Sequence, residues 1–308
     1  MNYLKNRIII ILCMLSLSIW IYFDYTTPKN VELSLKEITP NKNTTIFAAY
    51  SSDGTISDYV ISYLKRLKEI SPNIIYVTDN KISKQEIRKI KPFINHIIAY
   101  RHKEYDWGSF KRGFNFLKNN PKFKSNAELI LANDSTLAVT PSFKPIIDDF
   151  ENKKVDFYGI TANQDGIYHI QSYFMIFNPK LYTSKEFFDY LNNVTKQKDG
   201  LTVAYTYEVP FTKYFSDLGY THSTYINYDD LSYLELNDKH CYPLTMLSKH
   251  NLPLLKMRTF TNRLIVKEPR RLVFSWLKKN HYQTYRELIR HLKKIKSPYL
   301  KDNYQNDN

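Results

Sequence analysis

The sequence predicts an α/β fold, with a mostly parallel sheet flanked by helices, an N-terminal membrane anchor helix and a basic helical C-terminal tail. Between residues 44 and 161, short apolar runs alternate with segments whose apolar residues recur every three or four positions. The runs are continuously apolar, as expected for strands that helices cover on both faces. Glycine is scarce, with 7 residues in 308, and no GxGxxG or GxxxxGK[ST] motif occurs. A Rossmann dehydrogenase and a P-loop kinase are therefore disfavoured.

The chain begins with an uncharged apolar run, residues 8–23, preceded by Lys5 and Arg7. No small-residue cleavage site follows this run, which favours an uncleaved anchor over 1–25 rather than a removed signal peptide. The polar stretch 26–43 contains two prolines and is predicted to be a linker between the anchor and the folded domain.

A domain over residues 44–260 is expected, and its elements follow in order. Strands are predicted at 44–50, 73–79, 96–101, 128–134 and 155–161, and helices at 56–70, at 107–118 and from Pro141 or Pro145 toward 152. Ser83 and Glu86 form the capping box of another short helix. Beyond residue 161 the alternation stops. We expect a long aromatic strand at 168–177, a helix capped by Thr183 and Glu186, a helix at 207–219 and a strand near 220–228.

Positive charge is concentrated near the C-terminus. The net charge is +14, and residues 256–301 contain 14 Lys and Arg against 2 Glu. A basic helical region over 261–308 is predicted, and with the apolar N-terminus it favours an anionic membrane surface as partner. A basic nucleic-acid-binding protein is an alternative, but the charge lies outside the α/β core, so no nucleic acid is expected. No CxxC, HExxH or Cys/His cluster indicates zinc.

Polar residues follow five of the predicted strands. Because ligands of parallel sheets bind at the carboxyl ends of the strands, these residues predict the rim of one site. They are Ser51, Ser52, Asp53, Thr78, Asp79, Arg101, Asn133, Asp134 and Thr161. Asp53 is taken from this set as a candidate substrate-binding residue. Polar strand ends also mark ordinary turns.

Six motifs in order resemble the rhamnan synthesis protein F family. They are IFAAYSSDGTISDYVISYLKRL (46–67), YDWGSFKRG (105–113), ELILANDS (128–135), VDFYGIT (155–161), HIQSYFMIF (169–177) and YEVPFTKYFSDLGY (207–220), and NLPLLKMRTF (251–260) resembles the family's C-terminal end. Glu104 stands where the family usually has Gly, and TLAVTP replaces a Gly-Pro that usually follows NDS. The resemblance covers about 46–260. It implies a GT-A-like glycosyltransferase of cell-surface polysaccharide synthesis that uses a nucleotide sugar, dTDP-rhamnose being the expected donor.

Asp134, at the end of a predicted strand, is the candidate metal ligand. A divalent cation, Mg²⁺ or Mn²⁺, prefers oxygen ligands, and one carboxylate with phosphate oxygens and water can hold it. The resemblance implies this role, and Asn133 and Ser135 would orient Asp134 or contact the sugar. Alternatively, Asp134 caps the following turn.

Two further motifs supply candidate donor-binding residues. In YDWGS, Asp106 is expected to contact the donor, with Trp107 and Ser109 nearby; alternatively, Asp106 is an N-cap and Trp107 is core. In HIQSYF, strand alternation places His169, Gln171 and Tyr173 on one face and Ser172 on the other. All four are candidate sugar-binding residues, although a half-exposed strand would show the same pattern.

Glu208 is the candidate general base. Transfer from a β-linked donor to an α-linked product inverts the anomeric centre, which requires a base for the acceptor hydroxyl. Glu208 opens a predicted helix between apolar neighbours, and Asp165 and His169 are the reserve candidates. Alternatively, Glu208 is a first-turn carboxylate that interacts with the helix dipole.

The expected partners are a nucleotide-sugar donor, a glycan or lipid-linked acceptor, and the membrane. We expect a single-pass N-terminal anchor with the catalytic domain on the cytoplasmic face. A non-catalytic membrane-tethered glycan-binding module is the main alternative to an enzyme.

Overall fold

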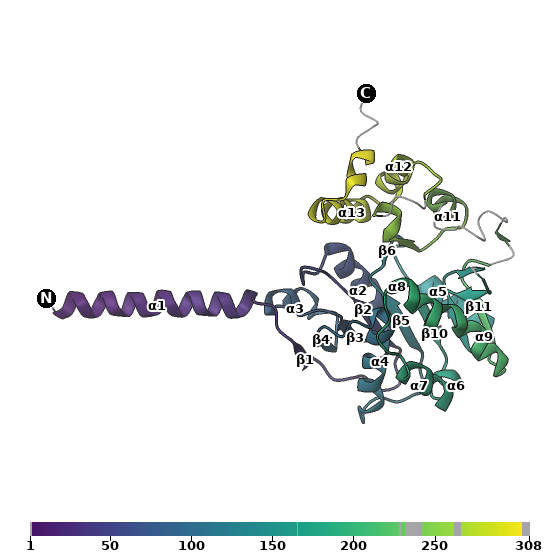
Figure 1. Cartoon of the computed structure of the whole chain (residues 1–308), viewed down its shortest axis with the longest axis horizontal. Coiled ribbons are helices and arrows are strands. Elements are labelled where there is room, and N and C mark those ends of the chain that lie inside the picture. Colours follow the sequence, from purple (N-terminus) through teal and green to yellow (C-terminus); the bar gives the residue numbers. More distant parts are fainter. Residues whose placement is uncertain (1, 165, 228–229, 232–241, 262–265, 304–308) are drawn as a thin grey trace.

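An eight-stranded sheet forms the centre of the structure, a computed structural model that describes residues 2–164, 166–227, 230–231, 242–261 and 266–303 (Figure 1). Side by side, its strands are β1 (Val31–Ser34), β4 (His96–Ala99), β3 (Asn73–Thr78), β2 (Thr44–Ala49), β5 (Leu129–Asn133), β10 (Phe174–Phe177), β7 (Phe157–Gly159) and β11 (His222–Thr224). All neighbours pair in parallel except β1 with β4 and β10 with both of its neighbours. The predicted mostly parallel sheet is thus confirmed.

Helices cover both faces of the sheet, which explains why its central strands β2, β3 and β5 are buried along their whole length. One apolar core contains residues of α2 (Asp58–Ile70), α3 (Lys84–Ile90), α5 (Lys144–Lys153), α11 (Pro243–Lys249), α12 (Arg270–Asn280) and α13 (Tyr282–Lys294). The core on the other face contains residues of α4 (Tyr105–Lys118), α6 (Pro179–Tyr182), α7 (Lys185–Asn192), α8 (Gly200–Val203), the π-helix η1 (Ala204–Glu208) and α9 (Val209–Asp217). Half of the predicted capping box is present: the Ser83 side chain accepts the Glu86 N–H at the start of α3, but the Glu86 carboxylate accepts the N–H of Ile56.

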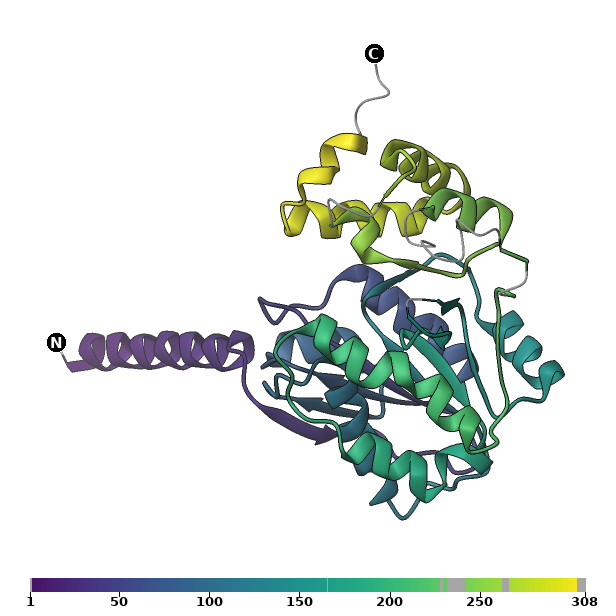
Figure 2. The same cartoon turned by 45° about the vertical axis from the view of Figure 1, so that its right-hand side comes forward.

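The basic C-terminal region is folded onto the rest of the chain. Figure 2 shows its helices, coloured yellow to green, stacked over the sheet domain, and α13 contacts α2. Several of their apolar residues are buried, among them Val273, Phe274, Leu277, Leu288 and Leu292. Leu277, one of the apolar residues among the basic residues of this region, is therefore unavailable to a membrane. The 3-10 helix η5 (Pro298–Asn303) follows α13.

The stretch 26–43, predicted as a linker, contributes the edge strand β1 to the sheet. β1 pairs antiparallel with β4, with Val31 opposite Ala99. Its side chains are largely exposed, so the polar sequence that suggested a linker also suits an edge strand with one solvated side.

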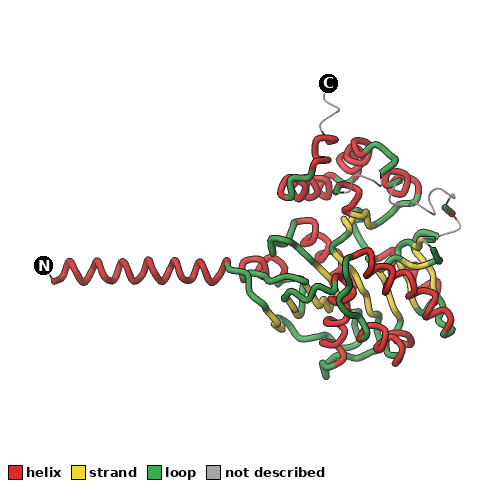
Figure 3. Tube along the Cα trace, in the orientation of Figure 1, coloured by secondary structure: helices red, strands yellow, loops and turns green. Residues whose placement is uncertain are grey.

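α1 (Asn2–Thr26) projects away from the other elements as a long single helix (Figure 3). Within the part of the chain that the structure describes, no helix is long and apolar enough to span a membrane. The predicted anchor run falls partly on residues 2–12 and 20, whose side chains lie outside that described part.

Two expectations in the second half of the domain were wrong in detail. The predicted strand 168–177 is interrupted: β9 (His169–Ile170) pairs with β8 (Ala162–Asn163), and β10 begins at Phe174. The cap of α7 is Ser184, which accepts the Phe187 N–H, whereas Thr183 ends α6. A further two-stranded sheet, β6 (Thr136–Ala138) with β12 (Leu254–Lys256), lacked any period-2 signal because both strands have three residues.

Candidate functional site

A cavity of about 540 Å³ opens at the carboxyl ends of β2, β3 and β5, the edge where ligands of parallel sheets bind. Polar residues from opposite ends of the sequence meet in it. The strand-end residues are Tyr50, Asp79, Arg101, Asn133, Asp134 and Ser135, and the remaining polar lining comes from Tyr105, Asp106, Asn163, His169, Gln171, Ser172, Tyr205, Glu208, Lys256 and Arg258. Of the nine predicted rim residues, Asp79, Arg101, Asn133 and Asp134 line this cavity, whereas Ser51, Ser52, Asp53, Thr78 and Thr161 do not.

Asp134 lies directly beyond β5 and is held by the neighbouring strand β2. Its own N–H donates to the carbonyl of Ala48 at 3.1 Å, and its Oδ2 accepts the N–H of Tyr50 at 2.9 Å. The Tyr59 hydroxyl donates to the Asp134 carbonyl at 3.0 Å. Burial, reinforced by the neighbouring Asp106 carboxylate, raises the pKa of Asp134 to about 7. A carboxylate so disfavoured as an anion is well placed to receive a cation.

Asp106 lies in the first turn of α4 and faces the same space. Its Oδ2 accepts a hydrogen bond from Asn133 Nδ2 at 2.9 Å, so Asn133 joins the end of β5 to α4. Asn133 Oδ1 also accepts the Ser135 hydroxyl at 2.6 Å. Burial, followed by the charge of Glu208, raises the pKa of Asp106. The Asp106 carboxylate thus interacts electrostatically with both Asp134 and Glu208.

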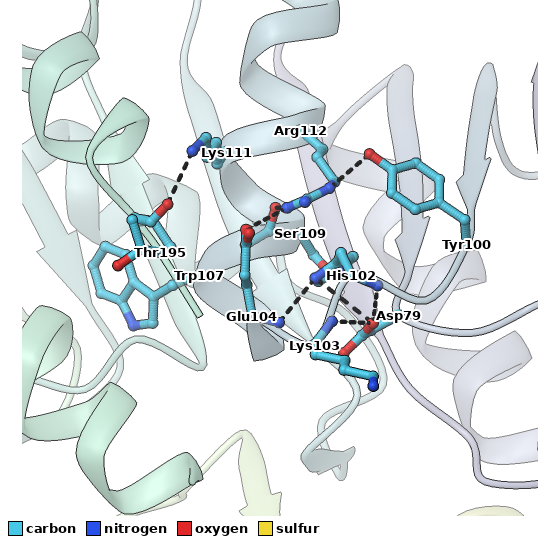
Figure 4. A network of polar contacts seen from close by, with 12 residues as sticks. Asp79, Tyr100, His102, Lys103, Glu104, Trp107, Ser109, Lys111, Arg112 and Thr195 are labelled. Carbon is cyan, nitrogen blue, oxygen red and sulfur yellow. Dashed lines mark hydrogen bonds and ion pairs between the residues drawn. The ribbon is translucent and has the colours of Figure 1, made fainter. Parts of the chain in front are cut away.

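The loop before α4 is fixed by a polar network (Figure 4). Asp79 Oδ1 accepts the N–H groups of His102 at 2.6 Å and Lys103 at 2.8 Å, and its Oδ2 accepts Arg101 at 2.6 Å. Such a network holds Lys103 in its left-handed backbone conformation, with φ at 64°. The loop therefore presents Asp106 from a rigid support.

Glu104, which stands where the family usually has Gly, belongs to the same network. Its Oε2 accepts a hydrogen bond from Arg112 at 2.6 Å, and Arg112 also donates to the Tyr100 hydroxyl at 2.7 Å (Figure 4). The side chain thus braces the first turns of α4. Gly108 is required beside it, because a Cβ there would lie 2.2 Å from Glu104 Cβ.

Glu208 reaches the cavity from the π-helix η1. Val209 N–H donates to the Ala204 carbonyl, five residues back, and Pro210 follows. Proline has no N–H to donate and crowds the carbonyl four residues before it, so the helix widens at this point. Glu208 Oε2 accepts both the N–H of Ser172, at 2.9 Å, and the Ser172 hydroxyl.

The segment 169–173 places its side chains differently from a continuous strand. His169, Gln171 and Ser172 all line the cavity, and His169 Nε2 lies 3.9 Å from Glu208 Oε1. Tyr173 is buried, with its hydroxyl 2.7 Å from Thr161 Oγ1. The turn before β10 breaks the alternation and brings Ser172 to the side predicted for Tyr173.

Four predicted substrate-binding residues, Tyr173 among them, do not line the cavity. Trp107 is 1% exposed and packs among aromatic residues of the second core. Ser109 is buried and lies 3.0 Å from His102 Nε2. Asp53 accepts the Ser51 and Thr55 hydroxyls in a turn that borders a different cavity. The reserve base Asp165 lies outside the described residues.

Two basic residues of the cavity were missed from the sequence. Lys256 and Arg258 occur in NLPLLKMRTF, the last of the quoted motifs, but we counted them with the basic C-terminal charge. Burial lowers the pKa of Lys256, while the nearby Glu208 and Asp106 carboxylates act to raise it. The available sequence signal was that Lys256 and Arg258 are two residues apart, at and just beyond the end of the short strand β12 (Leu254–Lys256).

The donor set fits a divalent cation in part. Asp134 and Asp106 provide hard oxygen ligands at the strand ends. In the described part of the chain, no group of three or more His, Cys, Asp or Glu side chains is placed to hold a metal. A cation here would therefore need further oxygens from a substrate or from water.

Comparison with known proteins places these residues in a family context. The family model described as rhamnan synthesis protein F matches residues 74–304. Among curated proteins, uncharacterized protein y4gN of Sinorhizobium fredii (strain NBRC 101917 / NGR234) is 22% identical over 182 residues, which are 57% of this chain and 46% of that protein. The chain thus spans about half the length of the curated relative it matches.

Solved structures show weaker likeness. S. aureus TarS 1-349 is 13% identical and covers 85% of this chain and 89% of its own, with a TM-score of 0.35. Core-mannan synthase A from Aspergillus fumigatus, in its Mn/GDP form, is 8% identical over 54% of this chain and 69% of its own, with a TM-score of 0.32. The 4-diphosphocytidyl-2C-methyl-D-erythritol synthase from Anaerococcus prevotii DSM 20548 is 18% identical over 54% and 82%, with a TM-score of 0.34. At these TM-scores the likenesses have no bearing on the site.

Proposed function

The chain belongs to the rhamnan synthesis protein F family, and from this premise we propose that it is a glycosyltransferase acting on a cell-surface polysaccharide or a lipid-linked glycan. The donor we propose is a nucleotide sugar, dTDP-rhamnose, and the reaction inverts the anomeric centre. The sheet serves as a GT-A-like scaffold, and donor and acceptor bind next to each other at the carboxyl ends of its parallel strands.

One observation carries this proposal: three carboxylates, Asp134, Asp106 and Glu208, and two cations, Lys256 and Arg258, line one cavity at that edge. Its volume of about 540 Å³ lies within the usual range for small-molecule sites. If these charged side chains had only a structural role, each carboxylate would be expected to form a close ion pair with a cation. Instead, the three carboxylates line the same cavity, and the negative charges of Asp106 and Glu208 act to raise the pKa of a neighbouring carboxyl group. Groups held in this way serve a ligand.

Glu208 is the residue we propose as general base. The acceptor hydroxyl oxygen forms a bond to the anomeric carbon of the donor sugar while the bond from that carbon to the diphosphate oxygen breaks. The diphosphate leaves with the bonding electron pair, and the hydroxyl proton moves to Glu208. Ser172 holds Oε2 with two hydrogen bonds, which orients the carboxylate toward the cavity. Asn163 and Gln171 also line the cavity, and we assign them to contacts with the sugar.

Asp134, supported by Asp106, would hold a divalent cation, Mg²⁺ or Mn²⁺. Such a cation, when bound, neutralises the negative charge of the departing diphosphate. The raised pKa of Asp134 supports this assignment, since a nearby cation would relieve the repulsion from Asp106. Asn133 holds Asp106, and Ser135 lies beside it at the strand end.

We also propose that α1 attaches the enzyme to the membrane, with the catalytic domain on the cytoplasmic face, where nucleotide sugars are made. Apolar side chains of α1 are exposed, among them Met14, Leu15, Leu17, Ile19 and Ile21. Removing residues 1–26 should release the protein from the membrane fraction and leave its nucleotide binding unchanged. Digestion of the domain by protease added outside intact cells would contradict the proposed sidedness.

The function is tested by incubating the purified protein with a panel of nucleotide sugars, with and without Mg²⁺ or Mn²⁺, and measuring nucleotide release. We expect release from one donor, dTDP-rhamnose, and its loss in Asp134→Ala. Release from none of the donors, with a glycan acceptor present, would refute the enzyme. Unchanged transfer in Asp134→Ala would refute the metal assignment.

A further inference from the structure

Lys256 is brought to the carboxylate cluster by a small sheet that the sequence did not reveal. β12 pairs antiparallel with β6, and Lys256 lies opposite Thr136. The Met257 N–H donates to the Ser135 carbonyl at 2.8 Å. Because β6 begins two residues after Asp134, these backbone bonds fix the position of Lys256 relative to the end of β5. The β6 residues are the TLA of the TLAVTP stretch that replaces the family's Gly-Pro.

The ammonium group of Lys256 lies beside a hydroxyl group and an aromatic ring. Its Nζ lies 3.5 Å from Ser135 Oγ and 4.3 Å from the centroid of the Tyr173 ring. Among the described residues, no carboxylate oxygen lies within 4.0 Å of this Nζ. A half-buried ammonium with a weak hydrogen bond and a ring contact keeps capacity for an anionic ligand.

Arg258 provides a second cation two residues on. It lies in the 3-10 helix η4 (Met257–Phe260), lines the same cavity and has an exposed side chain. Arg101, the other arginine of the lining, differs because Asp79 binds it at 2.6 Å. Lys256 and Arg258 are therefore two cations that line the same cavity. Among the described residues, neither forms a close ion pair with the cavity's carboxylates.

We propose that Lys256 and Arg258 bind a diphosphate, contacting its oxygens directly and stabilising the negative charge that develops as it leaves the sugar. This inference rests on the proposed function and assigns to it residues outside the strand-end carboxylates. A diphosphate is large enough to contact both cations, and the guanidinium fork suits two of its oxygens. Lys256 Nζ lies close to the hydroxyl of Ser135, the residue that follows Asp134. A donor diphosphate bound near Asp134 would therefore also lie near Lys256.

The test measures the binding of three ligands by isothermal titration calorimetry in EDTA and again in Mg²⁺. The ligands are a nucleoside diphosphate chosen from UDP, dTDP and GDP as the tightest binder, the matching nucleoside, and farnesyl diphosphate as a probe for a lipid-linked diphosphate. The variants are Lys256→Gln and Arg258→Gln, with Lys278→Gln in α12 as a control of equal charge and an exposed side chain. Lys256→Arg retains the charge.

Lys256→Gln and Arg258→Gln should each weaken nucleoside diphosphate binding about 10- to 100-fold, as expected for a lost charge-assisted hydrogen bond. Nucleoside binding and the Lys278→Gln control should not change, and Lys256→Arg should stay within a few-fold of wild type. Weakening confined to farnesyl diphosphate would assign the same site to the acceptor's diphosphate instead.

The inference is overturned if wild type binds a diphosphate ligand and both Gln variants bind it equally well. Equal loss of nucleoside and nucleoside diphosphate binding would also overturn it, because that pattern indicates a structural role. A wild type that binds none of the nucleotides would count against the proposed function itself. If Lys256→Gln fails to fold, Arg258→Gln decides the question, since its side chain is exposed.

Discussion

Asp134→Asn is expected to stabilise the ligand-free protein above neutral pH while abolishing sugar transfer. Burial and then the nearby Asp106 raise the pKa of Asp134 from 3.8 to about 7. The folded protein therefore binds this proton more tightly than the unfolded chain does. Between these two pKa values the free energy of unfolding falls as pH rises, because the native state holds more protons than the unfolded state. Asparagine cannot ionise, and its side-chain oxygen can still accept the Tyr50 N–H.

The magnitude follows from the difference between the two pKa values. A difference of about 3 corresponds to roughly 4 kcal/mol at about 1.36 kcal/mol for each tenfold change. Asp134 is half-buried and lines an open cavity. Solvent screening therefore reduces the expected loss of folding stability on ionisation of Asp134 to about 1–2 kcal/mol. The larger part of this cost develops between pH 5 and pH 8, where the gap between variant and wild type should widen by about 1 kcal/mol.

The assay is urea unfolding followed by tryptophan fluorescence in EDTA, at pH 5 and pH 8. Asp148→Asn, an exposed carboxylate of α5, is the matched control and should show no such pH-dependent gap. Adding Mg²⁺ or Mn²⁺ at pH 8 should stabilise wild type more than Asp134→Asn. An Asp134→Asn protein that is no more stable than wild type at pH 8 would refute the reasoning.

Three further predictions concern the base and the packing. Glu208→Gln should slow transfer about 100- to 10,000-fold with nucleotide binding unchanged; comparable loss of binding in calorimetry would contradict a role in proton transfer. Gly113→Ala should cost about 1–3 kcal/mol in urea unfolding, because its Cβ would lie 2.3 Å from Ile46 Cγ2, and combining it with Ile46→Ala should cost less than the sum. Leu288→Ala should cost about 2–5 kcal/mol, whereas Leu272→Ala, 41% exposed, should change stability little; equal losses would argue against burial of α13.

The first half of the fold could be predicted because its signals are local and regular. Five continuous apolar runs alternate with helices, most of them long enough to show a helical period, and strand ends in a parallel sheet share an edge. That reasoning brought Asp134 and Asn133 to the cavity correctly. It could not separate Asp53, because a turn that satisfies its own carboxylate looks the same in sequence as a strand end that faces a ligand.

The rest of the site depends on contacts that the sequence does not display. Ser172 faces the cavity because a turn breaks the strand, and Glu208 does so because a proline widens the helix before it. Lys256 arrives through a two-stranded sheet too short to show a period. In each case the decisive interaction is long-range or irregular, where residue preference alone is uninformative.

The packing of α13 on α2 has a consequence for the order in which the protein matures. Ser57 Oγ lies 2.9 Å from His291 Nδ1, and 234 positions separate the two residues. Tyr59 of the same helix packs on His291 and holds the carbonyl of Asp134. During synthesis the sheet can form long before α13 leaves the ribosome, because domains fold as their residues emerge. Until α13 has been synthesised and has docked on α2, the nascent protein would therefore carry an incompletely braced Asp134.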